Sequence, residues 1–384
     1  MAVIPQDIIQ QALTWRQELH AIPEIGLREF QTSKKISALL ESFGLEVHSS
    51  IAGTGIVAVL RNGDGPSIGI RSDMDALPMH ESNPLPWRSS NAGMMHACGH
   101  DGHMAILLGA ARYLSLTRAF YGTVYFIFQP AEENAGGGRL MVEAGLFDRF
   151  PMQAVYALHN WPGLPVGEVA ISHGAMMASQ DNFFITLTGK GCHAAMPEKG
   201  ADPIVAGAQL ILALQALGSR RLSPLEQTVI SVTQAQAGEA INVIPETLYL
   251  SGTLRCLTKE TRETCWRLME DYVRQVPIAN GVCGEIRWEF GYPVTCNHAE
   301  QVEILRDAAS HTPGIQRVHT SHLPSMAAED FAYLLEACPG AYFWLGADGE
   351  TPPISLHSPH YDFNDQLIEP GIGIWASLVE RSLK

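Results

Sequence analysis

Hydrophobic residues recur along most of the chain with either a helical or a strand spacing. Residues 5–20 and 28–43 carry apolar positions three or four residues apart, and the second pattern stops at Gly44, so two helices are expected. Short β-rich runs follow over Gly55–Leu60 and Ser67–Ile70, separated by Gly, Asn and Pro. Helices followed at once by strands predict an α/β sheet.

The same mixture of helical and strand patterns continues to residue 179 and resumes after residue 287. The expected elements are helix Met104–Leu116, strand Thr123–Phe128, strand Ala154–Leu158, helix Val302–Ala309, helix Asp330–Glu336, strand Tyr342–Leu345 and a last helix from Ile368. We therefore predict an α/β domain over residues 1–179 and 288–384, with a central sheet between helices.

The pattern changes over residues 180–287. Its expected elements are strand Phe183–Thr188, helix Pro203–Leu217, strand Thr228–Gln234, strand Thr247–Cys256, helix Arg262–Val276 and strand Glu285–Phe290. This βαββαβ order is that of a ferredoxin-like unit. We predict a satellite domain inserted into the first domain.

Composition and charge exclude several classes of protein. The 384 residues are 46% hydrophobic and 17% charged, which is typical of a globular chain long enough for two domains. A formal net charge of −15 argues against binding to nucleic acids or acidic membranes. A small anionic substrate would need a few cations placed locally.

Cysteine usage and the N-terminal segment bear on the compartment. Seven cysteines lie scattered without paired spacing, which favours reduced thiols. The first 20 residues lack the basic region and apolar run of a signal peptide, and no apolar stretch reaches the roughly 18 residues of a membrane span. We expect a soluble, cytoplasmic protein.

The segment from His96 to His103 holds the densest group of metal-binding side chains. It reads His-Ala-Cys-Gly-His-Asp-Gly-His. Cys98 and His100 stand close enough to bind one metal ion or two adjacent ones. We expect both as ligands, with Asp101 and His103 capping the following helix and supporting the ligands, while His96 has no assigned role. A His-rich helix start without a metal is the alternative.

Acidic residues follow two of the predicted strands, at the edge where α/β sheets bind ligands. In Glu132-Glu133, neighbouring side chains point in different directions, so Glu133 can bind a metal while Glu132 acts as general base on a water that the metal activates. Asp75, two residues after Asp73, is expected to orient a ligand histidine. The alternatives are a solvated acidic turn and an exposed strand-end cap.

Two single histidines complete a candidate ligand set. His159 follows a strand and His357 lies in a loop, and either alone would more often be a buried, hydrogen-bonded histidine. Together with Cys98, His100 and Glu133 they make a mixed sulfur, nitrogen and oxygen set. Five ligands are too many for one tetrahedral metal ion and suit two ions with open positions.

The inserted domain holds candidates for anion binding. Arg255 lies on one of its strands, and a guanidinium binds a carboxylate in a bidentate way. Asn242 lies beside the same strand, and His193 is a single imidazole in a turn. A surface arginine and a capping asparagine are the alternative reading.

Taken together, these motifs resemble the dinuclear metal amidohydrolases related to aminoacylase and carboxypeptidase G, in the branch of hippurate hydrolase and indole-3-acetyl-amino-acid hydrolase. The resemblance runs nearly end to end. The matching motifs are Glu18-Leu19-His20 to Pro23-Glu24, Asp73 to Pro78, His96 to His103, Gln129 to Glu133, His193 to Pro197, Asn242 to Pro245, Ala328 to Phe331 and Tyr361 to Asp365.

The resemblance implies roles for the candidate residues. The implied metal ligands are Cys98, His100, Glu133, His159 and His357. The implied base is Glu132, and the implied satellite residues, which bind the substrate carboxylate and stabilise the oxyanion, are His193, Asn242 and Arg255. Other branches carry a histidine before the strand-end Asp75, whereas this chain reads Ser72-Asp73-Met74-Asp75. Ligation therefore depends on the thiolate of Cys98, which leaves zinc, manganese, cobalt and nickel open.

The resemblance also implies the reaction. We expect two divalent metal ions per subunit and hydrolysis of the amide bond of N-acyl or N-aroyl amino acids to a carboxylic acid and an amino acid. A homodimer or higher homo-oligomer through the satellite domain is expected, with His193 acting in its own subunit or in its partner's. The alternatives are a metallo-dipeptidase or carboxypeptidase acting on short peptides, and a catalytically silent metal-dependent binding or scaffold protein.

Overall fold

The computed structural model describes residues 3–349 and 354–384, which divide into two compact units. The first unit comprises the described residues of Met1–Met176, Thr295–Leu323 and Asp330–Lys384. The second comprises Met177–Val294 and Pro324–Glu329. The segment 180–287, expected as the satellite, lies inside the second unit.

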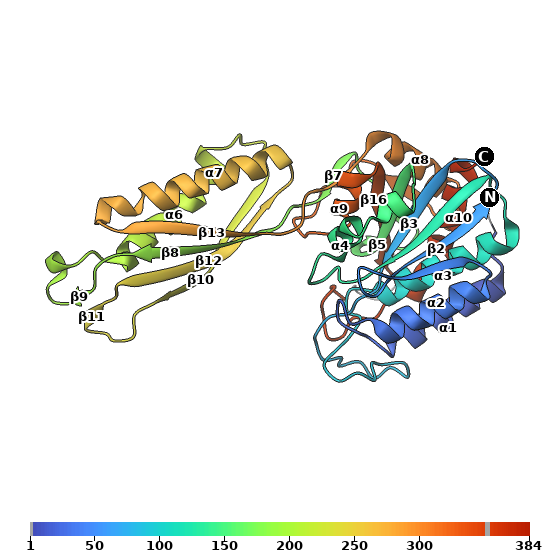
Figure 1. Ribbon diagram of the computed structural model, residues 1–384, viewed down its shortest axis with the longest axis horizontal. Helices are drawn as coiled ribbons and strands as arrows, with labels where there is room; N and C mark the ends of the chain where they lie inside the picture. Colours follow the sequence, from blue (N-terminus) through green and yellow to red (C-terminus); the bar gives the residue numbers. More distant parts are fainter. Residues whose placement is uncertain (1–2, 350–353) are drawn as a thin grey trace. The chain divides into compact units, whose positions relative to one another are not determined.

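The first unit alternates helices and strands (Figure 1). Its elements are α1 (Gln6–His20), α2 (Phe30–Ser42), β1 (Glu46–Ile51), β2 (Gly55–Asn62), β3 (Ser67–Asp73), α3 (His100–Thr117), β4 (Gly122–Gln129), α4 (Gly137–Glu143), α5 (Leu146–Arg149), β5 (Ala154–Pro165), β6 (Glu168–Ala170), β7 (Gly174–Met177), β14 (Thr295–Asn297), α8 (Ala299–Ser310), β15 (Arg317–His319), α9 (Ala332–Ala337), β16 (Gly340–Asp348), a 3₁₀ turn η3 (Asp365–Leu367) and α10 (Ile368–Ser382).

An eight-stranded sheet organises the first unit, in the order β1-β2-β4-β3-β5-β16-β6-β15. The central strands β4, β3, β5 and β16 run parallel to one another, so their carboxyl ends share one edge. The strands β2, β3 and β4 are buried along nearly their whole length, as expected for a sheet covered on both faces. The predicted α/β class is confirmed.

Helices α1, α2, α3, α8 and α10 pack together in the first unit, whereas α4 packs with α9 and α5. The helix α3 is buried on nearly every side, which its mostly apolar sequence allows. Gly109 permits the close approach of α10, because a Cβ at this position would lie 2.3 Å from Cδ1 of Ile372. The middle of α3 therefore packs closely against α10.

The second unit has the expected βαββαβ order (Figure 1). Its elements are β8 (Asp181–Thr188), β9 (Cys192–His193), a 3₁₀ turn η1 (Pro197–Lys199), α6 (Pro203–Arg220), β10 (Thr228–Ala237), β11 (Val243–Ile244), β12 (Thr247–Cys256), α7 (Lys259–Gln275), a 3₁₀ turn η2 (Pro277–Asn280) and β13 (Cys283–Phe290). The strand order β10-β12-β8-β13 is antiparallel throughout and is that of a ferredoxin-like fold. Alternate residues of β8 are buried under the two helices.

Two local expectations are wrong. The helix expected from Met104 begins at His100, so His100 and His103 lie in its first turn instead of in a loop. His159 does not end its strand, because β16 continues to pair with β5 beyond it and Gly346 still pairs with Trp161. Strand ends depend on a neighbouring strand that local sequence does not reveal.

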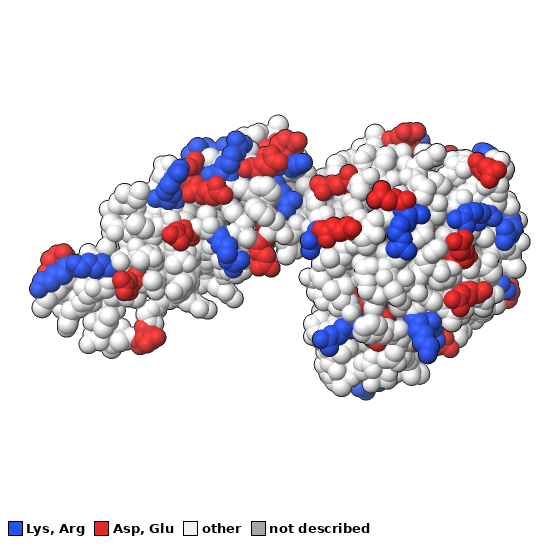
Figure 2. All heavy atoms as spheres, viewed as in Figure 1, with Lys and Arg blue, Asp and Glu red and all other residues white. Residues whose placement is uncertain are grey.

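Charged side chains of both signs are interspersed on the face shown in Figure 2. Among the residues that the structure describes, the helices are too short or too polar to cross a membrane.

Candidate metal centre

The shared carboxyl edge of the parallel strands gathers the predicted ligands. Glu132 and Glu133 follow β4, and His159 lies on β5. Cys98 and His100 flank Gly99, which has φ +93° and whose added Cβ would lie 2.5 Å from Oδ1 of Asn160. Glycine is therefore required for this close approach of the α3 start to β5.

Ligand atoms from the five predicted residues form two overlapping groups. Cys98, His100 and His159 make one group, and Sγ of Cys98 lies 3.4 Å from Nε2 of His159. Cys98, Glu133 and His357 make the other, with 3.2 Å between Oε1 of Glu133 and Nε2 of His357. Within each group all ligand atoms lie within 4.8 Å of one another. Cys98 belongs to both groups, so its thiol is a candidate ligand in each of them.

Backbone carbonyl groups orient two of the imidazoles. Nδ1 of His100 lies 2.8 Å from the carbonyl oxygen of Asp75, and Nδ1 of His159 lies 2.7 Å from that of Asn160. A carbonyl oxygen only accepts hydrogen bonds, so each Nδ1 carries a proton, and in the neutral ring Nε2 then presents its lone pair. Among the described residues, the buried Nε2 of His100 has no hydrogen-bond partner. This is the state a metal ligand needs.

A backbone hydrogen bond holds the loop that carries His357 beside the candidate ligand Cys98. His357 has φ +62°, which is uncommon for a residue with a side chain, and its backbone amide donates to the carbonyl of Ala97 at 2.8 Å. Ala97 precedes Cys98, so this bond brings His357 next to the shared thiol. The side chain of His357 is 52% exposed and lies on the open side of the group.

The electrostatics of the centre favour a cation. Burial, together with the charges of Glu133, Glu132 and Asp73, raises the pKa of the Cys98 thiol. Burial opposes protonation of His100, but the carboxylates of Asp73 and Asp75 outweigh it and raise the His100 pKa to about 10. Carboxylates grouped around a buried thiol are what a divalent ion would neutralise.

Asp75 contacts both parts of the centre. Its carbonyl oxygen orients His100, as described above, and its Oδ1 lies 3.5 Å from Nδ1 of the same ring. Its carboxylate accepts hydrogen bonds from the backbone amides of Glu132 at 3.0 Å and Glu133 at 2.9 Å. Sequence reasoning proposed the first contact but not the second.

The expected capping roles of Asp101 and His103 are wrong. Helix α3 has no side-chain cap at its N-terminus. His103 instead lies 2.7 Å from Oδ1 of Asp73 through Nδ1 and 2.5 Å from Oδ1 of Asn160 through Nε2. Its ring centroid is 4.7 Å from that of His159, so it packs directly behind a predicted ligand. The spacing of three residues between His100 and His103 could have indicated that His103 lies beside a ligand, because residues three apart are neighbours on a helix surface.

Asp101 belongs to a buried network that ties α1 to the start of α3. Its Oδ2 lies 3.0 Å from Nε of Arg16 and 2.8 Å from Nδ1 of His20, while Nε2 of His20 lies 3.2 Å from Glu81. Burial opposes protonation of His20, but Asp101 and Glu81 outweigh it and raise its pKa to about 9. His96, whose ring centroid is 6.3 Å from that of His20, is held neutral because burial lowers its pKa to about 3.

The three predicted satellite residues lie in two places within the second unit. His193 and Asn242 are neighbours, since β9 pairs with β11 and the amide of Ala194 donates to the Asn242 carbonyl at 3.0 Å. Arg255 lies near the other end of β12, a ten-residue strand that spans about 30 Å. There it donates a hydrogen bond to the carbonyl of Met326 at 3.2 Å and lines a hollow of ≈ 380 Å³. Within a single copy of the second unit, Arg255 therefore does not lie close to His193 and Asn242.

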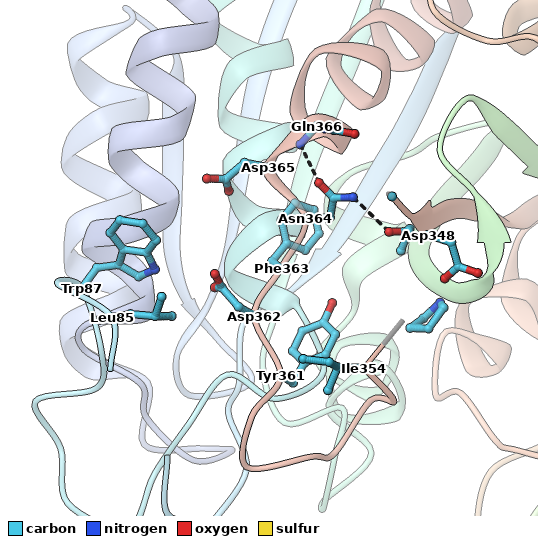
Figure 3. A pocket seen from close by; sticks show the side chains of 13 residues that line it. Leu85, Trp87, Asp348, Ile354, Tyr361, Asp362, Phe363, Asn364, Asp365 and Gln366 are labelled. Carbon is cyan, nitrogen blue, oxygen red and sulfur yellow. Dashed lines mark hydrogen bonds between the residues drawn. The ribbon is translucent and has the colours of Figure 1, made fainter. Parts of the chain in front are cut away.

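A pocket of ≈ 670 Å³ in the first unit is lined in part by residues 361–364, which belong to the loop that contains His357 (Figure 3). Trp87, Tyr361 and Phe363 supply aromatic rings, and Asp362 and Asp365 supply carboxylates. The hydroxyl of Tyr361 accepts a hydrogen bond from Asn160 at 2.5 Å, which joins this loop to the metal centre. The acidic lining does not suit a carboxylate ligand.

Known proteins are similar to this chain over most of its length. The family model described as peptidase family M20/M25/M40 matches residues 69–381. Hippurate hydrolase of Campylobacter jejuni is 38% identical over 370 residues, 96% of each chain. N-acetyl-L-cysteine deacetylase of Bacillus subtilis is 37% identical over 361 residues, 94% of this chain and 85% of that protein.

The solved structures include the YxeP protein of Bacillus subtilis, described as a dinuclear metal binding peptidase from the M20 family. It is 34% identical, with a TM-score of 0.87 over 99% of both chains. The resemblance drawn from the motifs is confirmed, and the chain is an amidohydrolase that belongs to peptidase family M20/M25/M40.

Proposed function

We propose that the protein hydrolyses the amide bond of N-acyl or N-aroyl amino acids, releasing a carboxylic acid and an amino acid. Relatives named hippurate hydrolase and N-acetyl-L-cysteine deacetylase, which match nearly the whole chain, support this substrate class. The observation that carries the proposal is the pair Glu132-Glu133 placed beside a shared thiol and two oriented imidazoles.

Two divalent metal ions are the proposed cofactors. Cys98, His100 and His159 would hold one, and Cys98, Glu133 and His357 the other, with Glu132 beside both His100 and Glu133. When bound, such ions lower the pKa of water and polarise a carbonyl group. A thiolate among imidazole and carboxylate ligands is compatible with zinc, manganese, cobalt or nickel.

Glu132 is the proposed general base. Its side chain is 8% exposed, and its backbone amide is held by Asp75. It accepts the proton of the attacking water and delivers it to the nitrogen of the leaving amine, so one carboxylate serves both steps. Glu133 faces His357, in keeping with the division of roles between the two neighbours.

The second unit is proposed to bind the amino-acid part of the substrate. Arg255 and Asn242 would hold its carboxylate, and His193 would stabilise the oxyanion. The amide of Ala195 donates to Nδ1 of His193 at 3.0 Å, so the neutral ring carries its proton on Nε2 and can donate it outward. This supports His193 as a hydrogen-bond donor.

A homodimer through the second unit is part of the proposal. The strand β10 is an edge of the antiparallel sheet, and edge strands readily pair with another chain. Large apolar side chains are exposed around it, among them Ile241 at 105%, Leu212 at 71% and Val205 at 48%.

A cytoplasmic location is also part of the proposal. All seven cysteines are free thiols, which supports a reducing compartment such as the cytoplasm.

Mixed oligomers test where His193 acts. Glu132→Gln and His193→Ala subunits should each be inactive alone. When co-expressed with different tags and purified as a mixed species, they should regain activity only if His193 completes the site of its partner. Unchanged inactivity of a verified mixed dimer would assign His193 to its own subunit.

A substrate panel tests the reaction itself. The panel consists of acetyl, benzoyl, indole-acetyl and long-chain acyl amino acids. The purified protein should hydrolyse at least one of them and should lose this activity in a chelator. Free dipeptides assayed beside them distinguish the alternative, a metallo-dipeptidase or carboxypeptidase. Hydrolysis of the free dipeptides alone would overturn the proposed substrate class, and absence of any chelator-sensitive hydrolysis would favour a silent binding protein.

A further inference from the structure

The backbone turn that presents the two glutamates is strained. Ala131, which follows β4 by two residues, has φ +55°, a left-handed conformation that is unfavourable for a residue with a side chain. It is fully buried. Such a conformation persists only where the surrounding structure holds it.

Two buried carboxylates hold three consecutive amides of this turn. The amide of Ala131 donates to Oε1 of Glu29 at 2.9 Å. The next two amides, of Glu132 and Glu133, donate to Asp75 at 3.0 and 2.9 Å. Hydrogen bonds to an ionised acceptor are about twice as strong as neutral ones.

Glu29 is committed to the turn. Its side chain is fully buried, and its second oxygen accepts a hydrogen bond from the hydroxyl of Thr54 at 2.6 Å. Glu29 precedes helix α2, but its side chain does not cap that helix. Capping is provided by Glu24, whose carboxylate accepts from the amides of Gln31 and Thr32 at 2.9 Å each.

The segment before Glu29 packs against the same turn. A Cβ added to Gly26 would lie 2.8 Å from Cα of Ala131 and 2.3 Å from Oδ1 of Asn134. Only glycine leaves room here. The loop between α1 and α2 is thus fitted to the turn by a close contact as well as by a hydrogen bond.

We propose that Glu29 is a positioning residue for the glutamate pair. By holding the amide of Ala131, it keeps the left-handed turn in the one geometry that directs Glu132 and Glu133 toward the centre. The inference rests on the proposed function for the role of Glu132 as base. It assigns a positioning role to a residue that lies 102 positions before Ala131 in the chain.

Three variants of the full-length protein test this inference. Glu29→Ala removes the acceptor, Glu29→Gln keeps an oxygen for the Ala131 amide, and Glu24→Ala is the matched control that removes a buried carboxylate of the same loop. The readouts are kcat and KM on the best panel substrate and the visible absorption spectrum of the Co²⁺-substituted protein.

We expect Glu29→Ala to lower kcat by ~10²-fold with KM within about twofold, because a misplaced catalytic group loses rate more than binding. It should also alter the Co²⁺ spectrum, since Glu133 moves with the turn. Glu29→Gln should restore both readouts, and Glu24→Ala should lower thermal stability while leaving both near wild type. Equal effects of Glu29→Ala and Glu24→Ala, or wild-type readouts in Glu29→Ala, would overturn the inference.

Two further outcomes are a Glu29→Ala variant that does not fold and a wild-type protein that is inactive, and each can be recognised. If Glu29→Ala does not fold, Gly26→Ala takes its place, because it displaces Ala131 while every hydrogen-bonding group remains; wild-type kcat and spectrum in that variant would count against the inference. Failure of the proposed function would appear as a wild-type protein inactive on all panel substrates. The Co²⁺ spectra still test the role of Glu29 in that case.

Discussion

Sγ of Cys98 and Nε2 of His159 lie 3.4 Å apart, although the two residues are 61 positions apart in the chain. The contact joins the start of α3 to the middle of β5 and makes the thiol common to both groups of candidate ligands. Several consequences of this arrangement and of its surroundings can be measured.

Cys98→Ser should impair metal retention. A hydroxyl is a weaker ligand than a thiolate for the softer divalent ions, and both groups lose a donor, so we expect at least ~10-fold weaker metal affinity. Metal content after dialysis, determined by mass spectrometry, measures it. Cys338→Ser, at a buried thiol outside the centre, is the control. A fully metallated, fully active Cys98→Ser protein would rule out Cys98 as a metal ligand.

Glu132→Gln should retain metal but lose turnover. The amide cannot accept the proton of water, and general-base catalysis contributes ~10²–10⁴-fold. We expect kcat to fall by that factor, with metal content and melting temperature near wild type. Substantial remaining activity would show that another group acts as the base.

Arg255→Ala should raise KM for substrates with a free carboxylate. Loss of a charge-assisted hydrogen bond costs ~1.5–3 kcal/mol, or roughly 10- to 100-fold in KM. Substrates whose carboxylate is capped as an amide should be unaffected, and Arg274→Ala, at an exposed pair with Asp271 on α7, serves as the control. Equal losses on free and capped substrates would argue against a carboxylate clamp.

His20→Gln should flatten the alkaline loss of stability. The folded-state pKa of His20 is raised from 6.5 to about 9, so its ion pairs contribute fully below pH 6.5 and the contribution disappears as pH rises through 9. The shift corresponds to about 3 kcal/mol. Urea unfolding at pH 6 and pH 10 should show a stability gap between wild type and variant that closes at the higher pH.

The control for this prediction is His48→Gln, at a partly exposed pair with Glu46. Because an exposed ion pair contributes little to stability, wild type and His48→Gln should differ little in unfolding free energy at pH 6 and at pH 10. A gap between wild type and His20→Gln that stays constant from pH 6 to pH 10 would show that the imidazolium is not the stabilising species.

The fold was largely predictable because helices and strands arise from local periodicity. The six elements of the βαββαβ segment follow from apolar spacings of two and of three to four residues, and the observed elements agree with them apart from their ends. The adjacency in Cys98-Gly99-His100 and in Glu132-Glu133 likewise needs no tertiary information. Residue types and spacing alone therefore indicated a candidate metal centre, and the resemblance to the dinuclear amidohydrolases supplied the reaction.

Only the tertiary structure decided which partners these residues have. His103 was expected to cap α3 but binds Asp73 and Asn160, and Asp101 binds His20, 81 positions earlier. The role of Glu29 could not be anticipated, because its bond to Ala131 spans 102 positions and depends on a left-handed turn. The sequence determined which chemical groups are present and in which elements, since periodicity and adjacency are local properties. The pairing of strands and loops selected which carboxylate holds which backbone amide, because those contacts form only when distant segments pack together.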